Sequence, residues 1–123
     1  RRTQAYCTAL GKVLLAYQSP SAVDTYLASV DLKPLTHNTI TSAEALRAEL
    51  KKIRTQGYAH DNEEMLVDHA CVGAPIRDHT GYVIAALSIA GLIDRFSVYG
   101  FDHLVIKVED TARAISRDLG FSG

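Results

Sequence analysis

Two apolar runs on either side of a short polar turn constrain the fold of this chain more than any other feature. Residues 69–77 and 82–90 flank residues 78–81, whose sequence Asp-His-Thr-Gly is typical of a turn. The pattern predicts an antiparallel β-hairpin over residues 69–90. If the turn is symmetric about its central peptide bond, Cys71 lies opposite Ser88.

One face of this hairpin carries little side-chain volume. Side chains alternate along a strand, so Cys71 and Gly73 share a face with Ala86, Ser88 and Ala90, with Gly73 opposite Ala86. Two interpretations stay open: the face lines a ligand pocket, or a helix packs closely against it. A bulge beside the proline of the first strand would change the register, because proline cannot donate to the ladder. The bulkier face is predicted to consist of Ala70, Val72, Ala74, Ile76, Val83, Ala85, Leu87 and Ile89.

Four stretches carry apolar residues at helical spacing. Thr8 is predicted to cap the first helix, and residues 19–20 (Ser-Pro) are predicted to open the second. Residues 41–44 are predicted to form a capping box for the third helix, which ends at Gly57. Asp102 is predicted to cap the last helix. The residues predicted to face the core are Leu10, Val13, Leu14, Tyr17, Val23, Tyr26, Leu27, Val30, Leu46, Leu50, Ile53, Leu104, Val105, Val108, Ala112, Ile115 and Leu119.

The remaining segments complete a single-domain prediction. Residues 58–61 are expected to form a strand, residues 31–40 a loop, and residues 91–100 an irregular segment. Helices, then an antiparallel sheet, then a helix indicate an α+β domain over residues 1–123, with the sheet flanked by helices. A helix signal follows residues 1–4 almost at once, so we expect the sequence to be part of a longer protein.

Composition excludes several classes of function. The apolar and charged fractions, 47% and 22%, are those of an ordinary globular protein. Thirteen basic and fourteen acidic residues leave a net charge of −1, so this piece is not expected to bind nucleic acid by itself. The longest apolar stretch, residues 82–93, is too short to span a membrane, and a cytoplasmic location is predicted. Cys7 and Cys71 are predicted to be reduced thiols.

A helix N-terminus beside the small-residue face would create an anion site. Residues 8–11 form the first turn of the first helix, where backbone N–H groups and the helix dipole favour negative charge. If this turn points at Cys71 and Ser88, the site combines these N–H groups with a thiol, a hydroxyl and the Asp61 carboxylate. Such a site is suited to a small organic acid.

A cysteine-dependent enzyme is an alternative, because Cys71 has three histidines nearby in sequence and Asp61 could orient one of them. No local signature of a cysteine enzyme and no metal-ligand spacing is present, so we predict neither catalysis nor a metal or cofactor. Adjacent Glu63 and Glu64 would point to opposite faces of a strand and could not share a substrate. The histidines concerned are His60, His69 and His79.

Short motifs along nearly the whole chain follow the order found in one known family. They are Cys7-Thr8-Ala9-Leu10-Gly11-Lys12, Leu14-Leu15-Ala16, Thr39-Ile40-Thr41, Leu50, Ile53-Arg54, Gly57-Tyr58-Ala59, Asp61-Asn62-Glu63-Glu64, Cys71-Val72-Gly73-Ala74-Pro75, Gly81, Ala85-Ala86-Leu87-Ser88-Ile89 and Gly91. With these motifs the chain resembles the effector-binding domain of the IclR family of bacterial transcriptional regulators.

The resemblance implies a fold and a function. Family members carry an N-terminal winged helix-turn-helix DNA-binding domain, a linker helix and an effector domain of GAF/PAS-like (profilin-like) fold, and they act as dimers or tetramers. The resemblance implies that this chain begins inside the effector domain and reaches DNA only through the absent N-terminal domain. It also implies a sensor of a small organic acid rather than an enzyme, with a pure oligomerisation module as another alternative.

The resemblance also implies a set of site residues. In the family, the pocket is lined by the backbone matching Ala9, Leu10 and Gly11, by the residues matching Asp61 and Cys71, and by two serines of the last strand, which match Ser88 and Ala90. The alanine removes one hydroxyl, so the ligand is expected to differ from the smallest keto acids. We expect the ligand carboxylate on the N–H groups of residues 9–11 and its neutral end at Asp61. Asp68 replaces a glycine usual before the cysteine strand, so that turn is expected to differ.

Overall fold

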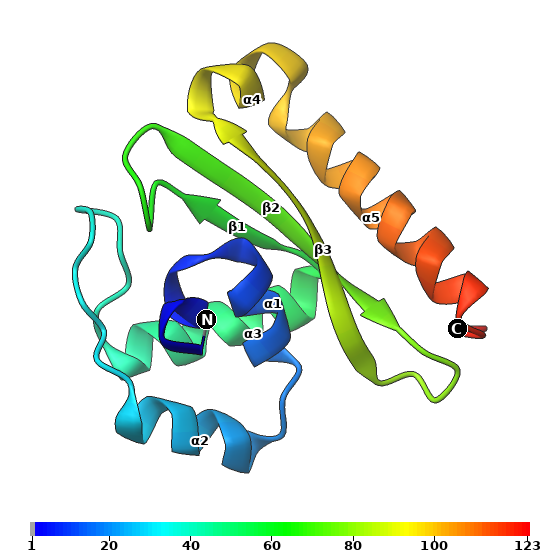
Figure 1. Ribbon diagram of the computed structural model, residues 1–123, viewed down its shortest axis with the longest axis horizontal. Coiled ribbons are helices and arrows are strands. Elements are labelled where there is room, and N and C mark those ends of the chain that lie inside the picture. Colours follow the sequence, from blue (N-terminus) through cyan, green and yellow to red (C-terminus); the bar gives the residue numbers. More distant parts are fainter. Residues whose placement is uncertain (1) are drawn as a thin grey trace.

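The computed structural model describes the backbone of residues 2–123 and the side chains from residue 5 onward, and in this part three strands form an antiparallel sheet in the order β1-β2-β3 (Figure 1). The fold class predicted from the sequence is therefore confirmed. The elements are η1 (Arg2–Cys7), α1 (Ala9–Ala16), α2 (Pro20–Ser29), α3 (Ala43–Gln56), β1 (Ala59–Asn62), β2 (His69–Arg77), β3 (Val83–Leu92), α4 (Ile93–Tyr99) and α5 (Phe101–Asp118).

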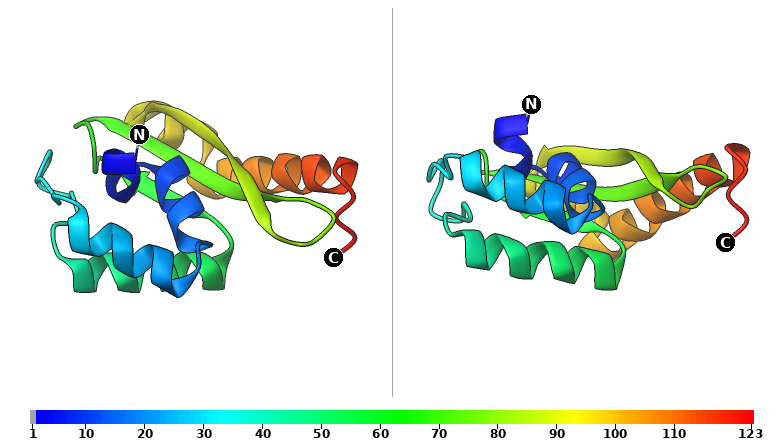
Figure 2. Two further views of the ribbon diagram at one scale, coloured as in Figure 1. Left: turned by 60° about the horizontal axis from the view of Figure 1, so that its bottom comes forward. Right: turned by 90° about the horizontal axis from the view of Figure 1, so that it is seen from below.

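The two faces of the sheet carry different helices. Helices α1 to α3 gather on one side and α4 and α5 on the other, as Figures 1 and 2 show. On the α1 side, Val13, Leu50 and Ile53 are among the buried residues of one core cluster. On the α5 side, Val72 and Val108 belong to a second cluster. None of the described helices is long and apolar enough to cross a membrane.

Helix starts follow the sequence signals closely. The hydroxyls of Thr8, Ser19 and Ser42 each accept a hydrogen bond from a backbone N–H in the first turn of α1, α2 and α3. Gly57 ends α3 with a φ of 89°, the left-handed conformation that glycine adopts at little cost. The capping box is wrong by one residue, because the N-cap is Ser42 and not Thr41.

Three other predictions about the helices are wrong. Residues 91–100 are not irregular, because β3 continues to Leu92 and α4 follows at once. Asp102 does not cap α5; the N-cap is Gly100, with a φ of 88° and no side chain to accept a bond. Leu10 and Leu119, predicted to face the core, are 42% and 44% exposed. In α1, the buried stripe instead passes through Ala9, Lys12, Val13 and Ala16.

The hairpin exists as predicted, but its register is shifted by two residues. Cys71 lies opposite Ala90 rather than Ser88, and Gly73 lies opposite Ser88 rather than Ala86. Next to the turn, Arg77 already pairs with Val83 and not with Tyr82, and the ladder shifts once more between Arg77 and Ile76. The second shift lies one residue from Pro75, where a bulge was expected to change the register. A shift of two keeps every side chain on its predicted face.

Candidate functional site

Helix α1 packs directly on the small-residue face of the sheet. A Cβ atom at Gly73 would lie 3.3 Å from the carbonyl carbon and oxygen of Ala9 and 3.4 Å from a Val13 methyl group. The close-packed helix, one of the two interpretations of this face, is therefore what the structure shows at Gly73. Its consequence is that the N-terminal turn of α1 lies over the sheet beside Cys71.

Two cross-strand rows lie under and beside this helix turn. Asp61, Cys71 and Ala90 are register partners across β1, β2 and β3 and form one row. Ala59, Gly73 and Ser88 form the next row on the same face. The predicted pairing of Cys71 with Ser88 is wrong. The four predicted site residues of the sheet nevertheless share one face: Asp61, Cys71, Ser88 and Ala90.

The Asp61 carboxylate is buried and is held by the turn that follows β1. Its Oδ1 accepts a 2.8 Å hydrogen bond from the Glu64 N–H, and Asp61 is only 5% exposed. Burial raises the pKa of the Asp61 carboxyl, while the backbone N–H of Glu64 and the Lys12 ammonium lower it. Burial is the largest of these effects, so the charged form of Asp61 is less favoured here than in water.

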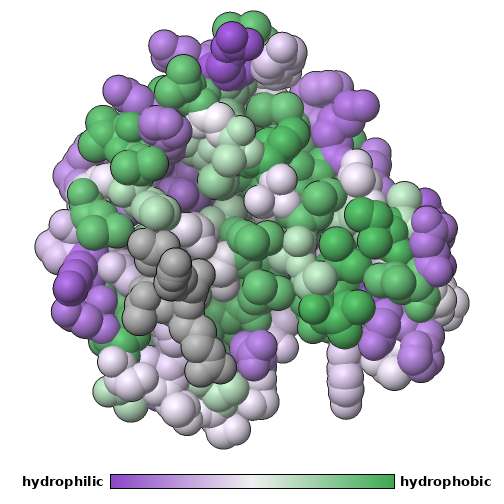
Figure 3. Space-filling view, in the orientation of Figure 1, coloured by the Kyte–Doolittle hydropathy of each residue, from purple (hydrophilic) through white to green (hydrophobic). Residues whose placement is uncertain are grey.

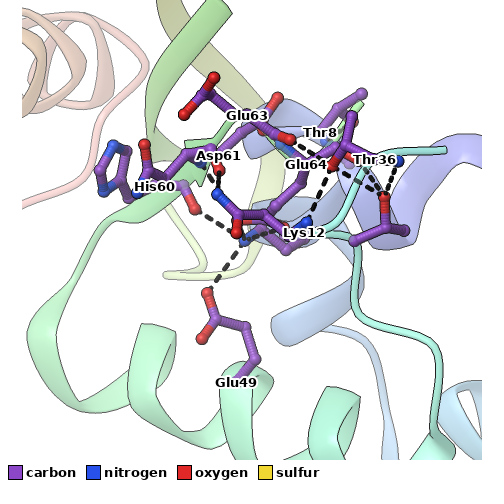
Figure 4. A network of polar contacts seen from close by, with 12 residues as sticks. Thr8, Lys12, Thr36, Glu49, His60, Asp61, Glu63 and Glu64 are labelled. Atoms are coloured by element: carbon purple, nitrogen blue, oxygen red, sulfur yellow. Dashed lines mark hydrogen bonds and ion pairs between the residues drawn. The ribbon is translucent and has the colours of Figure 1, made fainter. Parts of the chain in front are cut away.

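Lys12 is fully buried beneath the same turn and joins three parts of the chain. Its Nζ donates to Glu49 of α3 at 2.9 Å, to the His60 carbonyl of β1 at 2.7 Å and to both Glu64 carboxylate oxygens at 2.9 and 3.0 Å (Figure 4). All three ammonium protons therefore have acceptors. The Glu64 backbone in turn holds Asp61, so Lys12 fixes the turn that positions this carboxylate.

The importance of Lys12 was missed in the sequence. It lies between Ala9, Val13 and Ala16 on the buried stripe of α1, and a lysine at such a position must find partners because a lone buried charge is very unfavourable. The signal was present, therefore, but the stripe was assigned to the neighbouring side of the helix, which contains Leu10 and shares Val13 with the buried one. The prediction that Glu63 and Glu64 lie on opposite sides of a strand is also wrong, because both follow the end of β1.

The environment of Cys71 is not that of a nucleophile. Burial, followed by the nearby Asp61 carboxylate, raises the pKa of the Cys71 thiol, although the Ala9 N–H lowers it. A raised pKa leaves the thiol protonated, whereas a catalytic cysteine needs a lowered one. His60 pairs with Val72 and so faces the other side of the sheet, and the His69 Nδ1 lies 3.0 Å from the Val67 carbonyl.

The described residues bring together no cluster of three or more His, Cys, Asp or Glu side chains able to hold a metal ion. Cys7 and Cys71 both lie in the described part of the chain and form no disulfide, as predicted. Burial raises the pKa of the Cys7 thiol to about 11. Both thiols are therefore protonated at neutral pH.

The predicted three-membered N–H cradle is largely occupied by the protein itself. The Gly11 N–H donates to the Thr8 hydroxyl at 3.1 Å, and the Ala9 N–H is directed at the Cys71 sulfur. Of the three N–H groups, that of Leu10 makes no hydrogen bond to any of the described residues. A Cβ at Gly11 would lie 2.4 Å from the Ala5 Cα, so this glycine is required for the contact between η1 and α1.

The site is open on the β3 side. Ser88 and Ala90 are exposed, and β3 is an edge strand of the described sheet. Ile84 and Leu92, on the same face of β3 as Ser88, are exposed apolar side chains. Figure 3 shows a broad hydrophobic area over β3. A cavity of about 370 Å³ contains Leu10 and Gly11, but it lies between η1 and α1, away from Asp61 and Ser88.

The family model described as "Bacterial transcriptional regulator IclR C-terminal" matches residues 1–117. The chain belongs to the IclR family. It is 42% identical to the HTH-type transcriptional regulator KdgR of Escherichia coli over 121 residues, which are 98% of this chain and 46% of KdgR. This IclR-family chain therefore spans about half the length of that relative.

Solved structures agree with this assignment. The crystal structure of the C-terminal domain of E. coli KdgR superposes with a TM-score of 0.86 at 42% identity, covering 95% of this chain and 71% of that one. The inducer-binding domain of PobR from Acinetobacter, solved as a double mutant in complex with 3-hydroxybenzoic acid, gives a TM-score of 0.84 at 26% identity, covering 91% of this chain and 66% of that one. The IclR-family fold thus extends over nearly the whole chain.

One departure from the family pattern has a structural explanation. Asp68, which stands where a glycine was expected, has a φ of 68° and so adopts the left-handed conformation. Aspartate tolerates this conformation better than most residues other than glycine. The Asp68 N–H donates to the Glu63 carboxylate at 2.8 Å, and Glu63 itself has a φ of 57°. The turn before β2 in this IclR-family domain is thus kept by an aspartate.

Proposed function

We propose that this domain binds a small organic acid between the N-terminal turn of α1 and the sheet face that contains Asp61, Cys71 and Ser88. The observation that carries the proposal is the position of the α1 N-terminus over the Asp61–Cys71–Ala90 row, beside Ser88. The PobR domain, a relative of the same fold, is described as an inducer-binding domain in complex with a hydroxybenzoic acid. A carboxylic acid is the class of ligand that a helix N-terminus favours.

The charges of the site suggest how the acid lies. The ligand carboxylate interacts with the Leu10 N–H and the positive end of the α1 dipole, and a rotation of the Cys71 side chain away from the Ala9 N–H adds a second donor. Asp61 faces the neutral end of the ligand, because two carboxylates side by side repel each other. A hydroxyl at this end donates to the Asp61 carboxylate, whereas a keto oxygen accepts from Asp61 in its protonated form, which burial favours. Ser88 donates or accepts a further hydrogen bond, and Ala90 offers none. A hydroxy, keto or sugar acid has both kinds of group.

Effector binding would then act on the whole regulator. This chain spans 46% of KdgR, whose name describes a helix-turn-helix regulator, so DNA binding belongs to the remainder of such a protein. Self-association as a dimer or tetramer would let a bound acid favour one arrangement of the subunits and thereby change the spacing of their DNA-binding domains. A regulator of this kind works in the cytoplasm, where bacterial DNA is found.

A panel of hydroxy, keto and sugar acids tested by thermal shift, with hits measured by isothermal titration calorimetry, checks this function. We expect Ser88→Ala to weaken binding about two- to tenfold, the contribution of one hydrogen bond. Ser97→Ala, an exposed serine of α4, is the matched control and should leave the affinity unchanged. An affinity that does not change in Ser88→Ala contradicts the placement of the site, and no thermal shift with any acid favours a pure oligomerisation module.

A further inference from the structure

A second hollow lies at the opposite end of α1 from the proposed effector site. It has a volume of about 270 Å³ and is lined by the C-cap of α1, the end of α3, the end of β2 and the second half of α5. This volume is just below the roughly 300 Å³ at which small-molecule sites usually begin, so an occupant must be small. Four separate elements build the walls, which makes the hollow a product of the fold rather than of one loop.

Three arginines and one glutamate line this hollow, which gives it a net positive charge in a protein of net charge −1. They are Arg54 of α3, Arg77 of β2, and Arg113 and Glu109 of α5. The polar residues Thr55, Gln56 and Ser116 also line it. The hydroxyls of Thr55 and Ser116 donate to helix carbonyls, and the Gln56 Nε2 donates to the Tyr58 carbonyl, so the arginines are the main donors to a ligand.

Arg77 is fixed in place by its neighbours. Its guanidinium lies over the Tyr17 ring at 5.1 Å and the Phe121 ring at 5.9 Å from the ring centres. Its Nη1 donates to the Gly81 carbonyl at 2.8 Å. A guanidinium that lies over two aromatic rings keeps its orientation and loses little further freedom when it binds a ligand.

Arg54 lines the same hollow as Arg77 and is also oriented. Its Nη1 donates to the Ala16 carbonyl at 3.0 Å. Both arginines act on the same phenol: burial raises the pKa of the Tyr17 hydroxyl, whereas Arg77 and then Arg54 lower it. Two guanidinium groups therefore line the same hollow as Tyr17.

The charges of these two arginines are not neutralised by an ion pair. Among the described residues, neither Arg54 nor Arg77 has a carboxylate within 4.0 Å, whereas Arg113 pairs with Asp110 at 2.9 Å. Glu109 belongs to the hollow, but it makes no ion pair with either of them. Guanidinium groups prefer planar, two-point contact with a phosphate or carboxylate.

From this arrangement we infer a second, independent binding site for a small oxyanion, with Arg54 and Arg77 as its main ligands. A phosphate group, free or attached to a small metabolite, meets the size and charge of the hollow. Binding there joins the ends of α1 and α3 to β2 and α5, and so would tie together the two layers of helices on either side of the sheet.

Inorganic phosphate is the probe for this inference. Titration of the 123-residue chain, followed by backbone NMR at constant ionic strength set with chloride, should give saturable shifts in the amide signals of Gln56, Gly57, Arg77 and Ser116. Arg54→Gln should weaken binding about tenfold, which is the effect of losing one charge-assisted hydrogen-bond pair. Arg77→Lys keeps the charge but loses the planar fork, and should weaken binding by a similar factor.

Matched controls separate a site from general charge attraction. Arg47→Gln removes the same charge from α3 at an exposed residue that pairs with Asp24, and it should leave phosphate binding unchanged. Ser88→Ala should also have no effect, so the failure of one site does not imply failure of the other. Shifts that do not saturate, or equal weakening by Arg47→Gln and Arg54→Gln, would overturn the inference. A phosphate monoester that binds more tightly than phosphate would identify an attached rather than a free group.

Discussion

Removal of the buried Lys12 ammonium tests the central packing argument. In Lys12→Met, the side chain keeps most of its volume, but the two carboxylates of Glu49 and Glu64 and the His60 carbonyl lose their shared donor. Lys12 is 0% exposed and the Glu64 side chain 10% exposed, so water does not easily replace the ammonium. Breaking a buried ion pair by removing one partner costs about 3–5 kcal/mol. For a chain of this size, that corresponds to a fall in melting temperature on the order of 10–20 °C.

The dependence on pH distinguishes lost charge pairing from lost packing. Burial already raises the pKa values of Asp61 and Glu64, and Lys12 lowers both, so its removal raises them further. The folded variant then binds protons more readily than the wild type. The cost of Lys12→Met should accordingly be largest at pH 7 and shrink as the pH falls towards about 5, since protonation of the carboxyls relieves the uncompensated charge.

Urea unfolding followed by circular dichroism at pH 7 and pH 5 measures both effects. Lys52→Met, an exposed lysine of the same helix as Glu49, is the control and should change the free energy of unfolding by less than about 0.5 kcal/mol. The double variant Lys12→Met with Glu64→Gln should be more stable than Lys12→Met alone, because it removes one buried charge. A loss below about 1 kcal/mol at pH 7, or one that is the same at both pH values, would refute this account of Lys12.

Three further predictions concern the turns and the site. Gly11→Ala should lower the free energy of unfolding by about 1–3 kcal/mol in urea titrations, because the new Cβ would overlap the Ala5 backbone; an unchanged midpoint contradicts the η1–α1 contact. Gly57→Ala should cost about 1–2 kcal/mol in the same assay, since alanine resists a φ of 89°, and a stabilised variant would be at odds with this geometry. The pKa of the Asp61 carboxyl is raised in the folded state, so the folded protein binds this proton more tightly than the unfolded chain does. The carboxyl therefore adds its full contribution to the free energy of unfolding below its ordinary pKa, and this contribution is lost as the pH rises through the raised pKa. Asp61→Asn should therefore gain stability relative to the wild type as the pH rises from about 4 to 7, and a relative loss over that range argues against it.

Local signals in the sequence were sufficient for most of the elements. Thr8, Ser19, Ser42 and Gly57 mark helix ends through their own hydrogen bonds or backbone conformation, which depend on few neighbours. The faces of the hairpin follow from the alternation of side chains and survive the change of register. The sequence missed α4 because Gly91 and Gly100 were interpreted as breaks, although Gly91 lies in β3 and Gly100 caps α5.

The candidate site was predictable only in part. That Asp61, Cys71, Ser88 and Ala90 share one face follows from the alternation of side chains along strands, together with the resemblance to the IclR family. Which of them lie opposite each other depends on the turn, after which Arg77 pairs with Val83, and on the irregularity between Ile76 and Arg77, and no local rule fixes either. The occupation of the Ala9 and Gly11 N–H groups depends on the distance between α1 and the sheet.

The sequence by itself determined the α+β class, several of the helix ends, the two faces of the hairpin and the family, because each of these depends on residues close together in the chain or on the order of motifs. Only the tertiary structure decided the partners of Lys12, the open β3 side of the site and the hollow that Arg54 and Arg77 line together. Lys12 and Glu64 are separated by 52 positions, and Arg54 and Arg77 come from different elements. Such contacts depend on how helices and strands pack against each other, and residue spacing along the chain does not specify this packing.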